Sequence, residues 1–227
     1  MPWLSELKES LRRRRLSRRT PAEVFRRYYD KNKWGDAGSR SGKGSSLAAT
    51  EELRRLLPPL LTELGVTELL DVPCGDFHWM AQTDLSGLRY TGGDIVPEMI
   101  ARNREEHGRD GVRFQVIDLI KGPLPRADLV FCRDCLVHLS NAHIAAALEN
   151  VRRSGATWLL TTTFPDAPEN RDIATGQWRK VDLTKPPFRL RPPERLIEEG
   201  REGVKGQMAG KMLGLWRVAD LPETAAG

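Results

Sequence analysis

The chain has 227 residues, of which 39% are hydrophobic and 30% are charged. This balance is typical of one globular domain with a proper core, and it excludes an intrinsically disordered chain. No stretch approaches the roughly 18 consecutive apolar residues of a membrane-spanning helix, so a transmembrane segment is excluded. Three cysteines, an odd number, provide no disulfide scaffold and favour a reducing, cytoplasmic setting.

The positive charge is concentrated at the N-terminus. Residues 1–43 hold 13 Lys and Arg against 5 Asp and Glu, whereas residues 44–227 hold 23 against 26. We therefore divide the chain into a basic N-terminal arm and loop, residues 1–43, and a single domain, residues 44–227.

The arm contains a short amphipathic pattern. Leu4, Leu7 and Leu11 fall at helical spacing and are followed by four consecutive arginines at 12–15, so a short helix is predicted. Three interpretations are open. The arm binds an anionic molecule such as nucleic acid, it binds a membrane surface, or it is a solvated tail without a partner. No secretory leader is expected, because no apolar stretch follows the charges.

Residues 30–46 are almost all Gly, Ser and charged residues, which predicts a loop. A helix is expected to follow over residues 47–64, with Ser45 or Ser46 as its cap.

From residue 66 onward, apolar runs of strand length alternate with helical stretches. The predicted strands are residues 68–72, 88–94, 112–118, 127–132 and 157–164, and the predicted helices are residues 77–85, 97–106 and 141–153. This alternation predicts an α/β fold with a mostly parallel sheet covered by helices on both faces. Two late runs, residues 178–183 and 212–218, are expected to close the sheet as an antiparallel pair.

Polar residues follow four of the predicted strands, where an open parallel sheet binds its ligands. They are the turn 71–77, Asp94, Asp118 and the pair 133–134. Gly75 lets a ligand approach the backbone of the first turn. Asp94 suits a pair of ribose hydroxyls and Asp118 an adenine amino group, so these acids favour an adenosine-containing ligand.

Four segments, in this order, resemble the motifs of the class I S-adenosylmethionine-dependent methyltransferases. Residues 70–77, Leu-Asp-Val-Pro-Cys-Gly-Asp-Phe, look like the first motif, and residues 90–95, 116–119 and 128–139 look like the next three. The resemblance covers residues 66–164. It implies a Rossmann-like fold, S-adenosylmethionine as the cofactor and methyl transfer to a nitrogen or oxygen of an acceptor.

The resemblance also implies cofactor contacts at nine positions, which are Asp71, Gly75, Asp76, Phe77, Asp94, Ile95, Asp118, Leu119 and Cys132. Two motif glycines are replaced by Pro73 and Phe77. Pro73 removes one backbone donor, and Phe77 is expected to narrow the approach to the methionine end of the cofactor. Asp76 is expected to compensate by binding the cofactor's ammonium group.

The catalytic candidates lie in the fourth motif. Because the sulfonium is already activated, the protein mainly has to align the acceptor with the methyl group. A hydroxyl acceptor also needs a base, for which Asp134 and His138 are the candidates. Arg133 is expected to hold the cofactor carboxylate or an anionic substrate as a bidentate fork. For His138, a purely structural buried role is the alternative.

Two further segments are expected at the site. Trp34, Gly35 and residues 41–46 are expected to fold over the cofactor as a lid, or else to form an ordinary exposed loop. The long connection 165–185 is expected to shape the substrate pocket. The Cys132, Cys135 and His138 spacing suggests zinc, but a strand end and a helix start would point these side chains apart, so no metal is expected.

The acceptor itself is open at this point. A small molecule or a saccharide is favoured. The alternatives are an RNA-binding or RNA-modifying protein that uses the arginine-rich arm, and a non-catalytic nucleotide-binding relative on the same fold.

Overall fold

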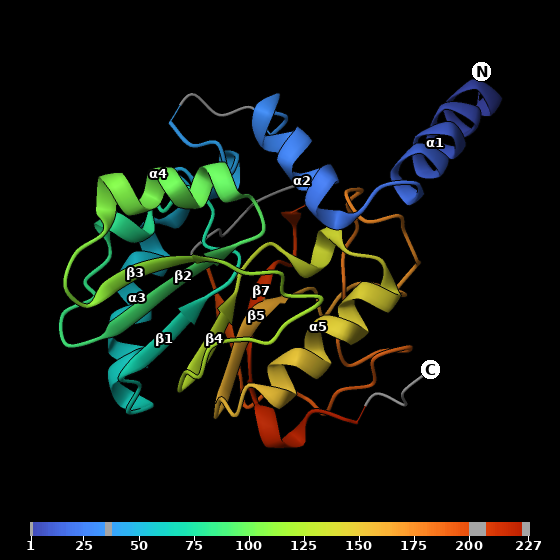
Figure 1. Cartoon of the computed structure of the whole chain (residues 1–227). Coiled ribbons are helices and arrows are strands. Elements are labelled where there is room, and N and C mark those ends of the chain that lie inside the picture. Colours follow the sequence, from blue (N-terminus) through green and yellow to red (C-terminus); the bar gives the residue numbers. More distant parts are fainter. Residues whose placement is uncertain (1, 35–37, 200–207, 224–227) are drawn as a thin grey trace.

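A seven-stranded sheet forms the centre of the molecule, whose computed structural model describes residues 2–34, 38–199 and 208–223. The strands are β1 Glu68–Asp71, β2 Arg89–Asp94, β3 Val112–Val116, β4 Leu129–Cys132, β5 Trp158–Thr163, β6 Arg195–Glu198 and β7 Met212–Arg217. They lie in the order β3-β2-β1-β4-β5-β7-β6 (Figure 1). Strands β1 to β5 are parallel, and β7 runs antiparallel to β5 and β6, which confirms the predicted mostly parallel sheet.

Helices cover both faces of the sheet. Helices α3 Glu51–Glu63 and α4 Pro97–His107 pack against one face and α5 Asn141–Arg153 packs against the other, whereas α2 Pro21–Asp30 lies next to α4 and α1 Pro2–Ser17 projects from the body (Figure 1). Because side chains alternate along a strand, Leu69 and Leu129 enter the core that includes α3 and α4, whereas Leu70 and Val130 enter the core under α5. Within the described residues, no helix combines the length and the hydropathy that crossing a bilayer requires.

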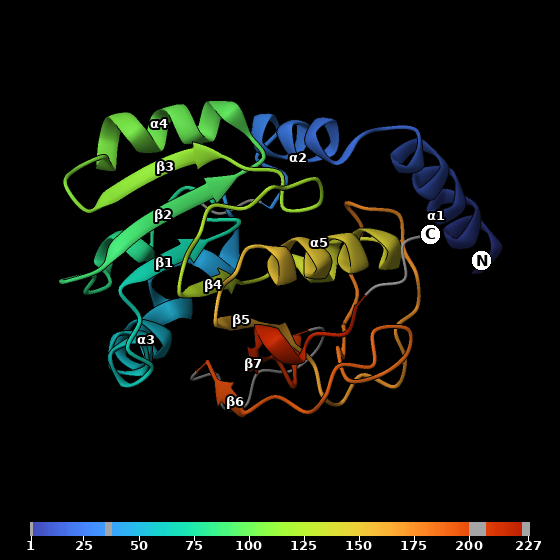
Figure 2. The same ribbon diagram turned by 60° about the horizontal axis from the view of Figure 1, so that its bottom comes forward.

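Helix α2 was not predicted, although the sequence carries its start signal. Thr20 and Glu23 form a capping box around Pro21, with the Thr20 side chain accepting from the Glu23 amide. Val24 and Tyr28 of α2 are buried, and the Tyr28 hydroxyl donates to the carbonyl of Gly176 at 2.7 Å. The second half of the proposed arm therefore packs on the globular body, next to α4 (Figure 1 and Figure 2).

Three predicted elements differ from the structure. Residues 178–183 form no strand; the Val181 carbonyl instead accepts from the Phe164 amide at 2.8 Å, and β6 takes the edge position beside β7. The predicted helix 77–85 is a turn that ends in a short 3-10 helix, Met80–Gln82. The Ser46 hydroxyl caps a 3-10 turn by accepting from the Ala49 amide at 3.2 Å, and α3 begins only at Glu51.

We expect Gly176→Ala to destabilise the protein more than Gly155→Ala. Both glycines have a positive φ, +99° and +74°, so each alanine incurs a backbone cost of roughly 1–2 kcal/mol. A Cβ on Gly176 would also lie 2.5 Å from Val24 Cγ1, whereas Gly155 faces open space, so the clash adds about 1–3 kcal/mol to the first variant. Urea unfolding measures the difference, and equal losses would contradict the packing of α2 on this turn.

Candidate active site

A cavity of about 370 Å³ lies beyond the carboxyl ends of the parallel strands. The turns after β1, β2, β3 and β4 line it on one side, and α2 and the loop before α3 line it on the other. Nine of the residues predicted from the sequence line this cavity, namely Asp71, Gly75, Ile95, Asp94, Asp118, Leu119, Arg133, Asp134 and His138. Asp76, Phe77 and Cys132 do not line it.

Three acids reach the cavity from successive strand ends, and each is held by nearby donors. Asp71 is buried and accepts from the Tyr90 hydroxyl at 2.6 Å, and burial raises its pKa to about 7. Asp94 is buried and accepts from the Val96 amide at 3.0 Å, and burial raises its pKa to about 6. Asp118 accepts from the amide of Ile120 at 2.9 Å. These contacts orient the three carboxylates.

Asp76 holds the loop before α3 instead of facing the cavity. Its carboxylate accepts from the Ser39 and Ser41 hydroxyls, both at 3.1 Å, and from the Arg40 amide at 2.7 Å. The loop packs so closely here that a Cβ on Gly75, which has φ +57°, would collide with the Ser41 hydroxyl. Asp76 is thus already occupied, which differs from the expected contact with the cofactor's ammonium group.

Phe77 and Cys132 lie in the core. Only 1% of each residue is exposed. The Phe77 backbone has φ 58°, and its ring packs against Tyr90 and Phe114 with centroid distances of 5.1 and 5.0 Å. The prediction that Phe77 narrows the cavity is therefore wrong, because its side chain packs into the hydrophobic core on one face of the sheet. Cys135, three residues after Cys132, lines the cavity.

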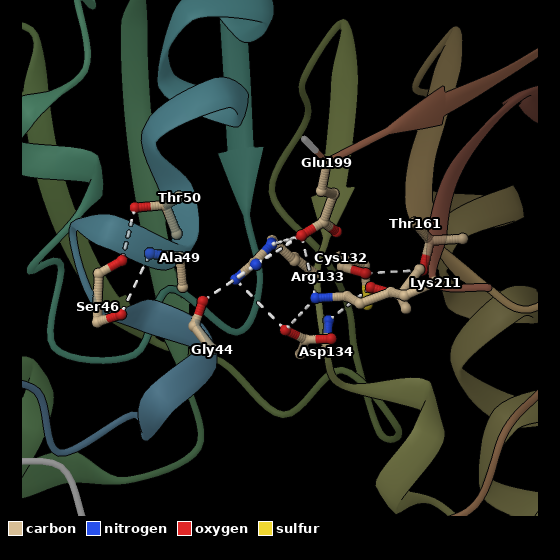
Figure 3. Close-up of polar contacts among 11 residues, drawn as sticks. Gly44, Ser46, Ala49, Thr50, Cys132, Arg133, Asp134, Thr161, Glu199 and Lys211 are labelled. Carbon is tan, nitrogen blue, oxygen red and sulfur yellow. Dashed lines mark hydrogen bonds and ion pairs between the residues drawn. The ribbon is translucent and has the colours of Figure 1, made fainter. Parts of the chain in front are cut away.

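A buried ionic cluster closes one end of the site (Figure 3). The Arg133 guanidinium bonds Glu199 through Nε at 3.0 Å and Nη2 at 2.6 Å, and it also donates to the Gly44 carbonyl at 3.1 Å. Lys211 Nζ lies 2.7 Å from Asp134 and 3.0 Å from Glu199. The Arg133 guanidinium, which was expected to bind a cofactor carboxylate or an anionic substrate, therefore binds the carboxylate of Glu199. Glu199 was not among the site residues predicted from the sequence.

The cluster also changes the chemistry of Asp134. Burial raises the pKa of this carboxyl, but Lys211 and Arg133 outweigh burial and hold the pKa well below its ordinary value. A carboxylate so strongly favoured in its ionised form is a poor proton acceptor. Asp134 lines the cavity as predicted, yet its electrostatics argue against a role as the base.

His138 has the opposite properties. It ends a short 3-10 helix, Leu136–His138, and its Nδ1 lies 3.0 Å from the Gln177 carbonyl oxygen. A carbonyl only accepts, so the neutral ring carries its proton on Nδ1 and presents Nε2 as an acceptor. Burial lowers the pKa of His138, which favours this neutral form. The Gln177 turn is held in place by the Tyr28 hydroxyl bond to Gly176.

Aromatic side chains line much of the remaining wall. Trp34 lies beside the His138 ring, with centroids 5.8 Å apart. Trp178 comes from the connection 165–185, which was expected to shape the pocket, and α2 adds two rings that the sequence analysis missed, Phe25 and Tyr29. Residues 41–45 of the expected lid also line the cavity, whereas Gly35 is outside the described residues.

Comparisons with known proteins agree with this fold. Residues 70–155 match a family model described as a methyltransferase domain. No curated relative matches the chain.

Solved structures share the fold at low sequence identity. The Burkholderia thailandensis 1,6-didemethyltoxoflavin-N1-methyltransferase, solved with 1,6-didemethyltoxoflavin and S-adenosylhomocysteine, has a TM-score of 0.58 at 18% identity, over 86% of this chain and 88% of that one. Human N-acetylserotonin methyltransferase, solved with SAM, has a TM-score of 0.51 at 15% identity, and the match covers 77% of this chain and 57% of that one. This chain therefore spans little more than half of the human protein. The methyltransferase domain of bacterial CtHen1-CN has a TM-score of 0.55 at 12% identity, and the match covers 76% of this chain and 100% of that one.

We expect Lys211→Met to destabilise the protein strongly. It leaves the buried Glu199 and the partly buried Asp134 beside a single cation, which costs about 3–5 kcal/mol. Lys180→Met is the matched control, because its 3.0 Å ion pair with Asp166 lies near the surface and contributes less than about 1 kcal/mol. Thermal and urea unfolding of both variants measure the contrast, and equally small losses would show that the cluster is not a buried unit.

Proposed function

We propose that this chain, which carries a class I S-adenosylmethionine-dependent methyltransferase domain, methylates a hydroxyl or nitrogen of a small acceptor with His138 as the base. The observation that carries the proposal is the 3.0 Å contact of His138 Nδ1 with the Gln177 carbonyl, which leaves Nε2 to accept a proton. Trp34 and Trp178 in the wall support an acceptor with a flat apolar face, such as an aromatic ring or one face of a saccharide.

The cavity suits the cofactor. Asp94 and Asp118 both line the cavity, and in this proposal Asp94 accepts from the ribose hydroxyls and Asp118 from the adenine amino group. Lys43 and Gly44 also line the cavity, and we propose that their amides bind the methionine carboxylate in the manner of a lid. Bound S-adenosylmethionine supplies a methyl group on a sulfonium, which is already activated for transfer.

The remaining chemistry is proton transfer and positioning. The aromatic wall orients the acceptor and excludes water, so that its nucleophile lies near the base. His138 Nε2 accepts the proton, and the Gln177 carbonyl keeps the ring in the required tautomer. The Asp134 carboxylate raises the pKa of His138 and so stabilises the imidazolium that forms, while its own proton affinity stays low.

We expect His138→Gln to lower turnover by about 100- to 10,000-fold while cofactor affinity is retained, because the lost group is a positioned base. Transfer from methyl-labelled S-adenosylmethionine to a panel of phenols, N-heterocycles and saccharides provides the assay, and calorimetry provides the affinity. His143→Gln is the matched control, since His143 bonds Thr175 at 2.7 Å and does not line the cavity. Unchanged turnover in His138→Gln would rule out this base.

Cofactor affinity should rise with pH between about 5 and 7. Ribose hydroxyls donate to a carboxylate, whereas unliganded Asp94 has a pKa raised to about 6 and is protonated below it. Binding then releases a proton, so affinity increases by up to about tenfold per pH unit below that pKa and levels off above it.

Calorimetry across this range tests the assignment. In Asp94→Asn the affinity should be lower and its pH slope flatter, whereas Asp84→Asn, which removes a carboxyl outside the cavity, should leave both unchanged. The variant is needed because Asp71 lines the same cavity with a pKa of about 7. An unaltered slope in Asp94→Asn would assign the titration to another group.

A further inference from the structure

We infer that helix α1 is a docking element for an anionic membrane surface, a function separate from methyl transfer. The helix projects from the body in both views (Figure 1 and Figure 2). Its C-terminal end is attached: Leu16 is buried with Val24 and Tyr28, and Arg13 lies 4.0 Å from Asp172. The last turn of the helix is therefore attached to the fold, and the rest of the helix extends away from it (Figure 1).

Three large apolar side chains of α1 are exposed to solvent. Trp3, Leu7 and Leu11 are 59%, 49% and 56% exposed. They are spaced by four residues, which places them along one face of the helix. The other large apolar side chains exposed in the described ranges, Leu47, Val116 and Leu196, lie on separate elements. Among the residues that the structure describes, only those of α1 place such side chains along one face of a helix, and an exposed apolar stripe of this kind marks an interaction surface.

Positive charge adjoins this stripe. Arginines occupy positions 12–15, 18 and 19, directly after the last apolar residue. Residues 20–227, which make up the body with α2, hold 29 basic and 29 acidic residues, so the body itself has no net attraction for an anionic surface. The geometry thus combines apolar residues for insertion at the headgroup level with arginines for anionic headgroups.

The length of α1 fits a helix that lies in the interface. Its 16 residues extend for about 24 Å, which is shorter than the hydrocarbon core, and its arginines oppose insertion across it. An RNA would use the arginines but would leave Trp3, Leu7 and Leu11 in water. A bilayer uses both features, and for this reason we assign the surface to anionic lipid.

Vesicle co-sedimentation of the full chain tests the inference. The protein should pellet with phosphatidylcholine vesicles that contain phosphatidylglycerol, and much less with phosphatidylcholine alone or at high salt. Leu7→Gln with Leu11→Gln should lower the partition coefficient at least about tenfold. Arg14→Gln and Arg15→Gln should each lower it about fivefold. Val116→Gln with Leu196→Gln, which removes exposed apolar residues from the body, should leave it unchanged.

Several outcomes would overturn the inference. One is equal pelleting with neutral and anionic vesicles. Another is a partition coefficient that is insensitive to the two leucines, together with RNA binding that persists in the same variant. A third is a dimer that Leu7→Gln with Leu11→Gln dissociates in the absence of lipid, which would assign the stripe to a second copy of the chain. Thermal unfolding checks that every variant remains folded.

Discussion

The site depends on one constraint, which is that the parallel strands of the sheet end at the same edge. Asp71 pairs with Gly92 of β2 and with Phe131 of β4, and Asp94 pairs with Val116 of β3. Because these strands share a direction and register, the turns that follow them leave the sheet at one edge. Acids from separate parts of the chain therefore meet around one cavity, where burial raises the pKa of Asp71 and Asp94.

The ionic cluster of Arg133, Asp134, Glu199 and Lys211 determines which polar side chains at this edge remain free for a ligand. Burying Arg133, Glu199 and Lys211 is costly, and the cost is offset only when each charge is paired and hydrogen-bonded, here with one another and with the partly buried Asp134. Arg133 and Asp134 are committed to that pairing with Glu199 and Lys211, so neither is available as a free fork or a base. Burial favours the neutral ring of His138 and a carbonyl orients it, which is why we propose His138, and not Asp134, as the base.

The N-terminal region is also part of the site. Asp76 holds residues 39–41 and Arg133 holds the Gly44 carbonyl, so this loop is tied to the turns after β1 and β4. Helix α2 packs beside it and supplies Phe25 and Tyr29 to the cavity wall. Charge balance placed a boundary at residue 43, but packing continues across it, and only α1 stands apart from the body (Figure 2).

The sequence by itself determined the strand–helix alternation, the order of the strand-end acids and the place of the cavity, because hydropathy period and turn residues are local properties. It did not determine which side chains face the cavity. Glu199 and Lys211 meet Arg133 and Asp134 across 66 and 77 residues of chain, and Phe77 turns inward because its backbone conformation and ring packing require it. Only the tertiary structure decided these contacts, since each depends on residues that the fold, and not the sequence order, brings together.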